Sequence, residues 1–295
     1  MVKWRLGQGV IVPMITPFDE EGEIDIGSAR SLAGRLDEAG TIVFVLGTTG
    51  EGFSIATDKR EQLVRAVVAE LGSGVVIYAG IPSNCLENQI EMGNKYFELG
   101  VSAVVAHLPC YYHLTEQEML VHLGRLADGL EGPLVLYNIP DNVGQSLPLG
   151  VVEELSHRDN VIGLKDTEED EKRLAKAMAM WGRREDFSYL IGHTGFAVTG
   201  LFLGAKGWVP MIGNLMPGVC RSLFAAAQRG ERTEAERAYR QISEVRAVCR
   251  SIAEVKYAAS LMKLCGQWVL PPLSEVDDEH KRRIGERLRG LGLLD

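Results

Sequence analysis

The sequence contains little cysteine, and its cysteines are scattered. Only five occur in 295 residues, and no pair has the C-x-x-C spacing of zinc sites and redox motifs. This low content excludes a disulfide framework and favours free thiols in a reducing compartment, so we expect a cytoplasmic protein. The six histidines do not cluster at ligand spacing and no H-E-x-x-H occurs, so no metal site is expected.

The chain also lacks long apolar runs and an excess of basic charge. No segment approaches the roughly 18 consecutive apolar residues of a transmembrane helix. Pro13 and Pro17 interrupt the N-terminal apolar run, which has no signal-peptide cleavage site. Lys and Arg number 31 against 40 Asp and Glu, a formal net charge of −9. Because phosphate backbones and anionic membranes attract basic surfaces, neither nucleic acid nor a membrane is expected as a partner.

Short apolar runs rich in Val, Ile and Leu alternate along the chain with stretches of helical period. Runs that are apolar throughout are typical of strands buried on both faces of a parallel sheet. The predicted strands are 10–15, 42–46, 75–79, 103–106, 134–137, 161–164, 189–191 and 208–211. The predicted helices between and after them are 26–39, 58–71, 88–99, 116–126, 149–156, 171–181, 196–203 and 217–229.

Eight strand–helix units in about 230 residues predict an α/β protein with a TIM (β/α)₈ barrel. The alternative is a doubly wound open sheet, but its G-x-G-x-x-G fingerprint is absent after the first strand. We expect residues 1–230 to form the barrel that carries the active site and residues 231–295 to form a C-terminal helical region. Its predicted helices are 233–251, with a capping box at Thr233 and Glu236, then 255–264 and 277–291.

Lys165 is the most informative residue, because it ends an apolar strand where barrel enzymes place their reacting groups. Burial disfavours the charged form of a lysine, and the neutral amine is a nucleophile that forms Schiff bases with ketones. The alternative is a structural lysine that reaches solvent or pairs with Asp166.

Other polar residues follow the strands at the same end of the barrel. Thr48, Thr49 and Gly50 lie in a glycine-rich loop whose hydroxyls and N–H groups suit a small anion, although an ordinary glycine turn is the alternative. Tyr137 could relay protons or could be structural, and Tyr111 and Tyr112 share that ambiguity.

Three motifs in order resemble the signatures of the dihydrodipicolinate synthase / N-acetylneuraminate lyase family. They are Gly47-Thr-Thr-Gly-Glu51, Tyr137-Asn-Ile-Pro140 and Gly163-Leu-Lys-Asp-Thr167, and the resemblance extends from Ile15-Thr-Pro-Phe18 to Val255-Lys256. It implies a class I lyase, an enzyme that needs no cofactor because Lys165 forms an imine with pyruvate or another 2-oxo acid. It also implies a homo-oligomer, a dimer or tetramer.

The same resemblance implies roles for individual residues. Thr48 and Thr49 would hold the carboxylate of the 2-oxo acid, and Val209 would line its pocket. Tyr137 would pass protons to and from the substrate oxygen. Tyr111 would come from a neighbouring subunit and complete the proton relay with Thr48. The adjacent Tyr112 is the alternative for this role, because loop lengths vary in the family.

Two departures from the family pattern bear on the substrate. Synthases of lysine biosynthesis carry an arginine two residues after Tyr-Asn-x-Pro, where this chain has Asn142. Sialic acid lyases carry an acidic pair after strand seven, where this chain has His193 and Thr194. We therefore expect an aldolase or dehydratase acting on pyruvate or a 2-keto-3-deoxy sugar acid, with Asn142, His193 and Thr194 as substrate contacts. The alternatives are dihydrodipicolinate synthase, which condenses pyruvate with aspartate semialdehyde, and a non-catalytic protein that binds 2-oxo acids.

Overall fold

The computed structural model describes residues 7–294, and its centre is a closed barrel of eight parallel strands. The strands follow one another around the barrel in chain order, and β1 closes it by pairing with β8. They are β1 (Gly9–Pro13), β2 (Ile42–Val45), β3 (Ile77–Gly80), β4 (Ala103–His107), β5 (Leu134–Asn138), β6 (Val161–Asp166), β7 (Ser188–Ile191) and β8 (Gly207–Trp208). The predicted TIM barrel is confirmed.

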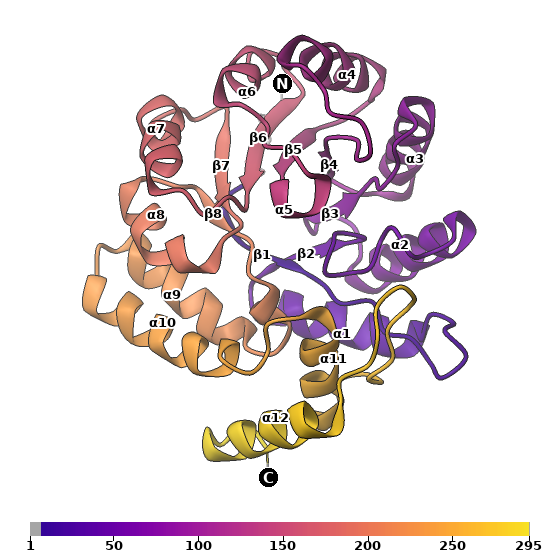
Figure 1. Cartoon of the computed structure of the whole chain (residues 1–295), viewed down its shortest axis with the longest axis vertical. Helices are drawn as coiled ribbons and strands as arrows, with labels where there is room; N and C mark the ends of the chain where they lie inside the picture. The colour runs from indigo at the N-terminus through magenta and orange to yellow at the C-terminus, as the bar shows by residue number, and fades with distance from the viewer. Residues whose placement is uncertain (1–6, 295) are drawn as a thin grey trace.

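Helices surround the barrel as an outer ring (Figure 1). Those within the barrel repeat are α1 (Ile26–Glu38), α2 (Thr57–Leu71), α3 (Leu86–Leu99), α4 (Glu116–Gly129), α6 (Leu149–Leu155), α7 (Glu171–Trp181), α8 (Ala197–Leu203) and α9 (Pro217–Gln228). One further short helix, α5 (Pro140–Val143), was not predicted and lies inside this ring in the view of Figure 1. It begins at Pro140, which supplies no N–H and therefore suits the first turn of a helix.

The strands are apolar because both of their faces are buried. Alternate residues such as Ile11, Phe44 and Val135 fill the barrel interior, while their neighbours pack outward against the helices. The polar residues at the carboxyl ends of the strands are thereby held on a rigid frame.

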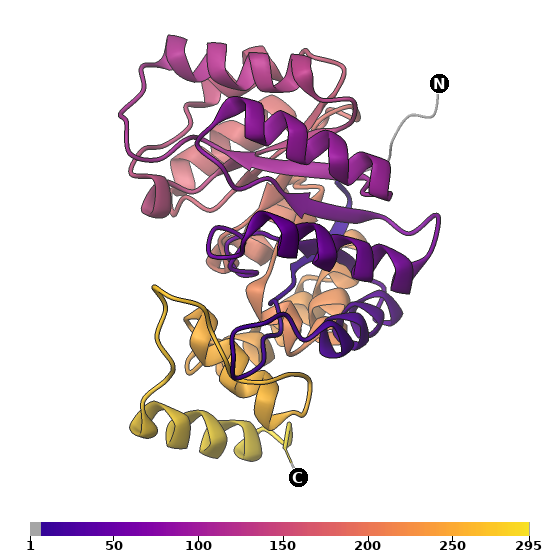
Figure 2. The same cartoon turned by 90° about the vertical axis from the view of Figure 1, so that its right-hand side faces the viewer.

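Three helices follow the barrel repeat: α10 (Arg232–Arg246), α11 (Ile252–Leu261) and α12 (Asp278–Gly290). Helix α10 packs on α8 and α9, whereas α11 and α12 pack on each other. Figure 2 shows α11 and α12 on one side of the barrel, with α12 outermost. The division of the chain at residue 230 stays a prediction. No helix within residues 7–294 is long and apolar enough to cross a membrane.

Two local predictions are wrong. The box expected at Thr233 is absent, because α10 already begins at Arg232 and has no side-chain cap; the box instead joins Ser251 to Glu254 and opens α11. The last strand ends at Trp208 rather than at residue 211. Pro210, two residues beyond, has no N–H to continue the ladder, and a 3₁₀ turn begins at Met211.

Candidate active site

Lys165 is the penultimate residue of strand β6, and its side chain lies inside the barrel beside Tyr137 of β5. Its Nζ lies 3.8 Å from the centroid of the Tyr137 ring and 5.2 Å from that of Phe44, and the residue is only 5% exposed. This burial lowers the pKa of the Lys165 amine from 10.5 to about 7. A large share of the amine is therefore neutral, and so nucleophilic, at physiological pH.

Asp166 is not the partner of Lys165, because successive strand residues face opposite sides of the sheet. Its Oδ2 accepts a 2.7 Å hydrogen bond from Arg173 Nε, and its Oδ1 accepts one of 2.8 Å from Asn138 Nδ2. Asn138 Oδ1 in turn accepts from the Leu147 N–H at 2.8 Å. The network ties the ends of β5 and β6 together, and the Lys165 amine pairs with no carboxylate in the part of the chain that the structure describes.

The loop after β2 brings two threonines to the lysine. It is tightly folded: Leu46 and Glu51 adopt positive φ angles of 59° and 56°, and a Cβ on Gly52 would lie 2.2 Å from the Leu46 carbonyl oxygen. The Thr48 side chain lies close enough to the Tyr137 phenol to lower its pKa, but burial has the larger effect. Burial raises the pKa of that phenol, so Tyr137 stays protonated and able to donate.

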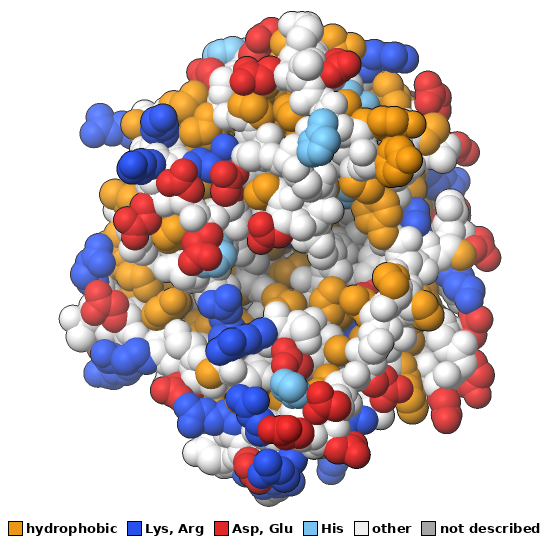
Figure 3. Space-filling model, in the orientation of Figure 1, with side chains coloured by type: hydrophobic (Ala, Val, Ile, Leu, Met, Phe, Trp, Pro, Cys, Tyr) orange, Lys and Arg blue, Asp and Glu red, His pale blue; other side chains and the backbone are white. Residues whose placement is uncertain are grey.

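These groups line a cavity of about 250 Å³. It opens at the hollow near the centre of the face shown in Figure 3. Eight residues singled out from the sequence form part of its wall: Thr48, Thr49, Tyr137, Asn142, Lys165, His193, Thr194 and Val209. A larger cavity of about 540 Å³ surrounds the start of β1 and contains none of them. The chemistry therefore points to the smaller cavity.

Two other residues predicted for the site lie elsewhere. Gly50 does not line the cavity; its carbonyl accepts a 2.7 Å hydrogen bond from Thr16 Oγ1, and a Cβ there would approach the Met14 carbonyl at 2.9 Å. Tyr111 is 88% exposed and Tyr112 70%, and neither lines this cavity. Gly50 thus supports the loop in this structure, while the predicted role of Tyr111 in a neighbouring subunit stays a prediction.

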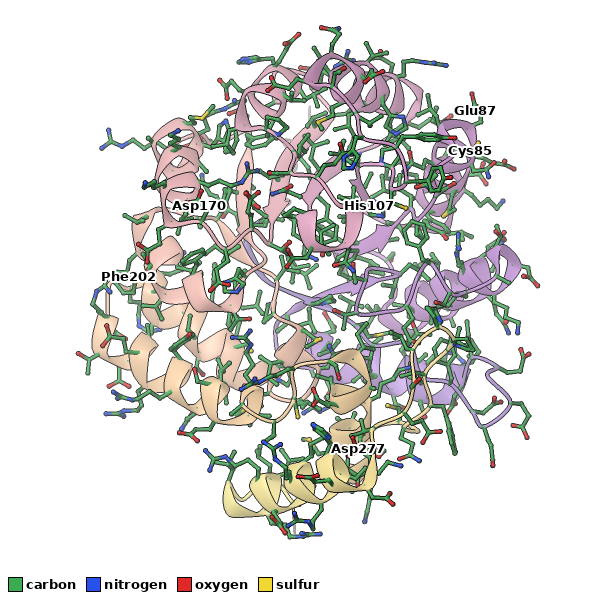
Figure 4. The ribbon with its side chains drawn as sticks, viewed as in Figure 1. Cys85, Glu87, His107, Asp170, Phe202 and Asp277 are labelled. Atoms are coloured by element: carbon green, nitrogen blue, oxygen red, sulfur yellow. The ribbon has the colours of Figure 1, made fainter. Side chains whose placement is uncertain are left out.

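Sequence reasoning missed His107 as a member of the site. It ends β4 and lies on the inner side of the helix ring (Figure 4), where its ring is tilted against that of Phe53 and edge-on to that of Tyr137. It lines an adjoining cavity of about 310 Å³ that also includes Thr48 and Asn142. Burial lowers its pKa, so the imidazole is neutral near pH 7. Its spacing in the sequence could have revealed this position. Alternate residues of a strand face the same side, and His107 continues the series of Ala103 and Val105, which face the barrel interior.

Two arginines were missed as well. Arg246 and Arg250 come from the end of α10 and the segment that follows it, yet both line the same cavity as Lys165. No sequence signal marked them, because they lie some eighty residues beyond the lysine in a region of many charged residues.

Comparison with known proteins identifies close counterparts of the whole chain. The model of the dihydrodipicolinate synthetase family matches residues 7–290. A 4-hydroxy-tetrahydrodipicolinate synthase of Chlorobium limicola is 27% identical over 296 residues, which cover 98% of this chain and 99% of the relative. An uncharacterised DapA-like lyase of Halobacterium salinarum is 29% identical over 290 residues, covering 97% of this chain and 94% of the relative.

Solved structures agree with this grouping. YagE, a prophage protein of the dihydrodipicolinic acid synthase family from E. coli K12 whose structure holds pyruvate, has a TM-score of 0.92 and 26% identity, covering 98% of this chain and 99% of its own. Dihydrodipicolinate synthase from Aquifex aeolicus has a TM-score of 0.91 and 25% identity, with coverage of 97% and 98%.

Proposed function

Because this chain belongs to the dihydrodipicolinate synthetase family, whose members are class I lyases, we propose that Lys165 forms a Schiff base with pyruvate or another 2-oxo acid. The observation that carries the proposal is the buried amine, whose pKa of about 7 leaves it a nucleophile near neutral pH.

In the proposed reaction, the Lys165 nitrogen attacks the ketone carbon of the substrate, and the ketone oxygen leaves as water. Two protons must reach that oxygen, and the Tyr137 phenol, whose ring lies beside the Lys165 amine, is the group that we assign to pass them. The resulting iminium withdraws the electron pair of a neighbouring bond. It can thereby cleave or form a carbon–carbon bond, or eliminate water, without a further cofactor.

The carboxylate of the 2-oxo acid is assigned to Thr48 and Thr49, which line the cavity beside Lys165. Hydroxyl and N–H donors that converge in one cavity can bind a small anion, even on a protein of net charge −9. Val209 supplies an apolar wall.

For the rest of the substrate we favour a 2-keto-3-deoxy sugar acid. Asn142 lies on α5 at the cavity, where a neutral amide cannot replace the bidentate guanidinium expected of lysine-pathway synthases. His193 and Thr194 add polar groups that suit hydroxyls. The second candidate is 4-hydroxy-tetrahydrodipicolinate synthase itself, since curated relatives along the whole chain carry that name.

Borohydride trapping tests the imine. We expect the protein incubated with pyruvate and sodium borohydride to gain one covalent adduct, located on Lys165 by peptide mass mapping. The Lys165→Ala variant should gain none, and Lys176→Ala, at an exposed lysine on α7, should be labelled like the wild type. Absence of an adduct on the wild type, or equal labelling of Lys165→Ala, refutes the mechanism and leaves a protein that only binds 2-oxo acids.

Two assays separate the candidate reactions. Incubation with a panel of 2-keto-3-deoxy acids, followed for pyruvate release, should identify an aldolase substrate, and release of water without pyruvate indicates a dehydratase. Condensation of pyruvate with aspartate semialdehyde should be slow and should improve in Asn142→Arg. Rapid condensation that is unaffected by changes at residue 142 favours the synthase.

We further propose that the enzyme is a homo-oligomer in a reducing compartment such as the cytoplasm. Tyr111 is too exposed to serve its own site, and an exposed aromatic pair is a candidate for contact with a second copy. All five cysteines are free thiols, which suits reducing conditions. Light scattering of the purified protein measures the oligomer directly.

A further inference from the structure

Two positive side chains without partners line the wall of the lysine cavity. Arg246 ends α10 and Arg250 directly precedes the residue that caps α11. Neither guanidinium makes an ion pair or a side-chain hydrogen bond within residues 7–294, although the backbone N–H of Arg250 donates to Glu254 Oε2 at 2.8 Å. Both are therefore available to a ligand in the cavity.

The nearby acids are already occupied. On α10, Glu244 pairs with Arg287 and Glu236 with Arg232, and Glu254 caps the start of α11. The remaining carboxylate of the cavity wall is Asp141 on α5. With Lys165 included, the wall carries more basic than acidic side chains, the reverse of the chain as a whole. Figure 3 shows positive side chains gathered at the edge of the hollow on the side of α10.

The cavity also reaches beyond the groups assigned to the 2-oxo acid. Its volume of about 250 Å³ is several times the roughly 30 Å³ that one water occupies in the liquid. The groups assigned to the 2-oxo acid, Thr48, Thr49 and Lys165, come from β6 and the loop after β2. The arginines come from the C-terminal helices, so they offer a separate set of donors in the same cavity.

We propose that Arg246 and Arg250 bind a second anionic group at the far end of the substrate, a carboxylate or a phosphate. The proposal rests on the Schiff-base function and adds a specificity determinant to it. A guanidinium presents a planar fork of N–H donors that matches both anions, so the pair supplies the positive charge that Asn142 does not. The preferred substrates are then 2-oxo acids that carry a negative charge at the end remote from the ketone.

A structural role is the competing explanation, because Arg246 lies in the last turn of α10, where a positive charge stabilises the helix dipole. Arg250 also borders a smaller cavity of about 110 Å³ with Glu254, His280 and Arg283. Each arginine is therefore tested separately as well as together.

The test compares two six-carbon probes in the borohydride assay. 2-Oxoadipate ends in a carboxylate, and 2-oxohexanoate has the same length but ends in a methyl group. For each, the concentration that gives half-maximal adduct on Lys165 is measured, and the ratio of the two defines the preference for the anion. We expect the wild type to favour 2-oxoadipate by about tenfold or more. Arg246→Gln and Arg250→Gln should each lose part of that preference, and the double variant Arg246→Gln/Arg250→Gln should lose most of it. Arg240→Gln, at an exposed position of α10 outside the cavity, removes one positive charge, as each single arginine variant does, and should keep the preference.

The experiment distinguishes failure of the arginine proposal from failure of the proposed Schiff-base function. If pyruvate itself gives no adduct, the proposed function fails. If pyruvate is trapped but the wild type shows no preference, or the preference survives in the double variant or disappears equally in Arg240→Gln, the arginine site is refuted. Competition then separates the two anions: inhibition of 2-oxoadipate trapping by inorganic phosphate indicates a phosphate subsite, and inhibition by glutarate indicates a carboxylate subsite.

Discussion

The Nζ of Lys256 lies 2.5 Å from Oε1 of Glu51, and both side chains are fully buried. Lys256 belongs to α11, whereas Glu51 follows the loop that carries Thr48 and Thr49. Lys256 Nζ also donates to the Trp268 carbonyl at 2.6 Å, and Glu51 Oε2 accepts from the Leu270 N–H at 2.7 Å. The C-terminal segment is thus fastened to the loop that we assign to the substrate carboxylate.

Breaking this pair should destabilise the protein. Lys256→Met leaves the Glu51 carboxylate buried without its cation, and we expect a loss of about 3–5 kcal/mol in the free energy of unfolding, measured by urea denaturation. Glu51→Leu should cost a similar amount. The KM for pyruvate should also rise in any variant that still folds, because the loop loses its support.

The double variant Glu51→Leu/Lys256→Met distinguishes a buried ion pair from simple packing. We expect it to cost much less than the sum of the single changes, since no unpaired charge remains. Arg65→Met is the control, because it breaks the surface pair with Glu61 and should change stability by less than about 1 kcal/mol. Additive losses in the double variant would contradict the role given to the pair.

The rate of imine formation should follow the titration of Lys165. Since burial lowers the pKa of the amine to about 7, the initial rate of pyruvate trapping should rise as pH increases through that value and level off above pH 8. A cyanoborohydride quench between pH 5.5 and 10 measures the profile. A midpoint near 10, the ordinary value for lysine, would show that Lys165 is not desolvated in solution.

Lys165→Met should be inactive yet more stable than the wild type. In the unfolded chain the amine titrates near 10.5 and in the folded chain near 7, so folding at an intermediate pH must release a proton. This proton release lowers the free energy of unfolding of the wild type by an amount on the order of 3 kcal/mol at pH 8. The loss grows as pH falls towards 7 and vanishes above pH 10.5.

Urea denaturation at pH 7 and pH 9 measures how much more stable Lys165→Met is than the wild type and how that difference changes with pH. The increase in the free energy of unfolding of Lys165→Met should be larger at pH 7 than at pH 9. Lys176→Met, at an exposed lysine, should show no such dependence on pH. A variant that is less stable than the wild type at both values would refute this account of the buried amine.

The fold and the inner part of the site were predictable because their signals are local. Buried strands such as β5 and β6 read as continuous apolar runs, and Lys165 stands out at the end of one of them. The alternation of side chains along a β-strand also places His107 on the inner face of β4, but the predicted strand ended at residue 106 and His107 was considered only as one of six histidines that do not cluster.

The remaining features depend on contacts between distant segments. Glu51 and Lys256 are separated by about two hundred residues, and each alone resembles an ordinary charged residue of a loop or a helix. Arg246 and Arg250 meet the cavity only because α10 packs on α8 and α9. The wrong capping box arose because Thr233-Glu-Ala-Glu236 and Ser251-Ile-Ala-Glu254 both have the spacing of a box, and packing decides which of them begins a helix.

The final prediction concerns Tyr111, whose φ of 91° is rare for a residue with a side chain and whose ring stands in solvent against that of Tyr112. If Tyr111 completes the proton relay of a neighbouring copy, Tyr111→Phe should lower the rate of pyruvate trapping while its own Lys165 remains intact. Tyr112→Phe should have a much smaller effect, which also decides between the two tyrosines.

Mixing two defective variants tests whether Tyr111 acts across subunits. Tyr111→Phe supplies an intact Lys165, and Lys165→Ala supplies an intact Tyr111. When the two are unfolded together and refolded, mixed oligomers should contain some sites with both wild-type residues and should recover part of the trapping rate. If Tyr111 acts within its own chain, every site lacks one of the two groups and no recovery is possible. Recovery in the mixture, but not in either variant refolded alone, would therefore place the tyrosine of one copy in the site of another.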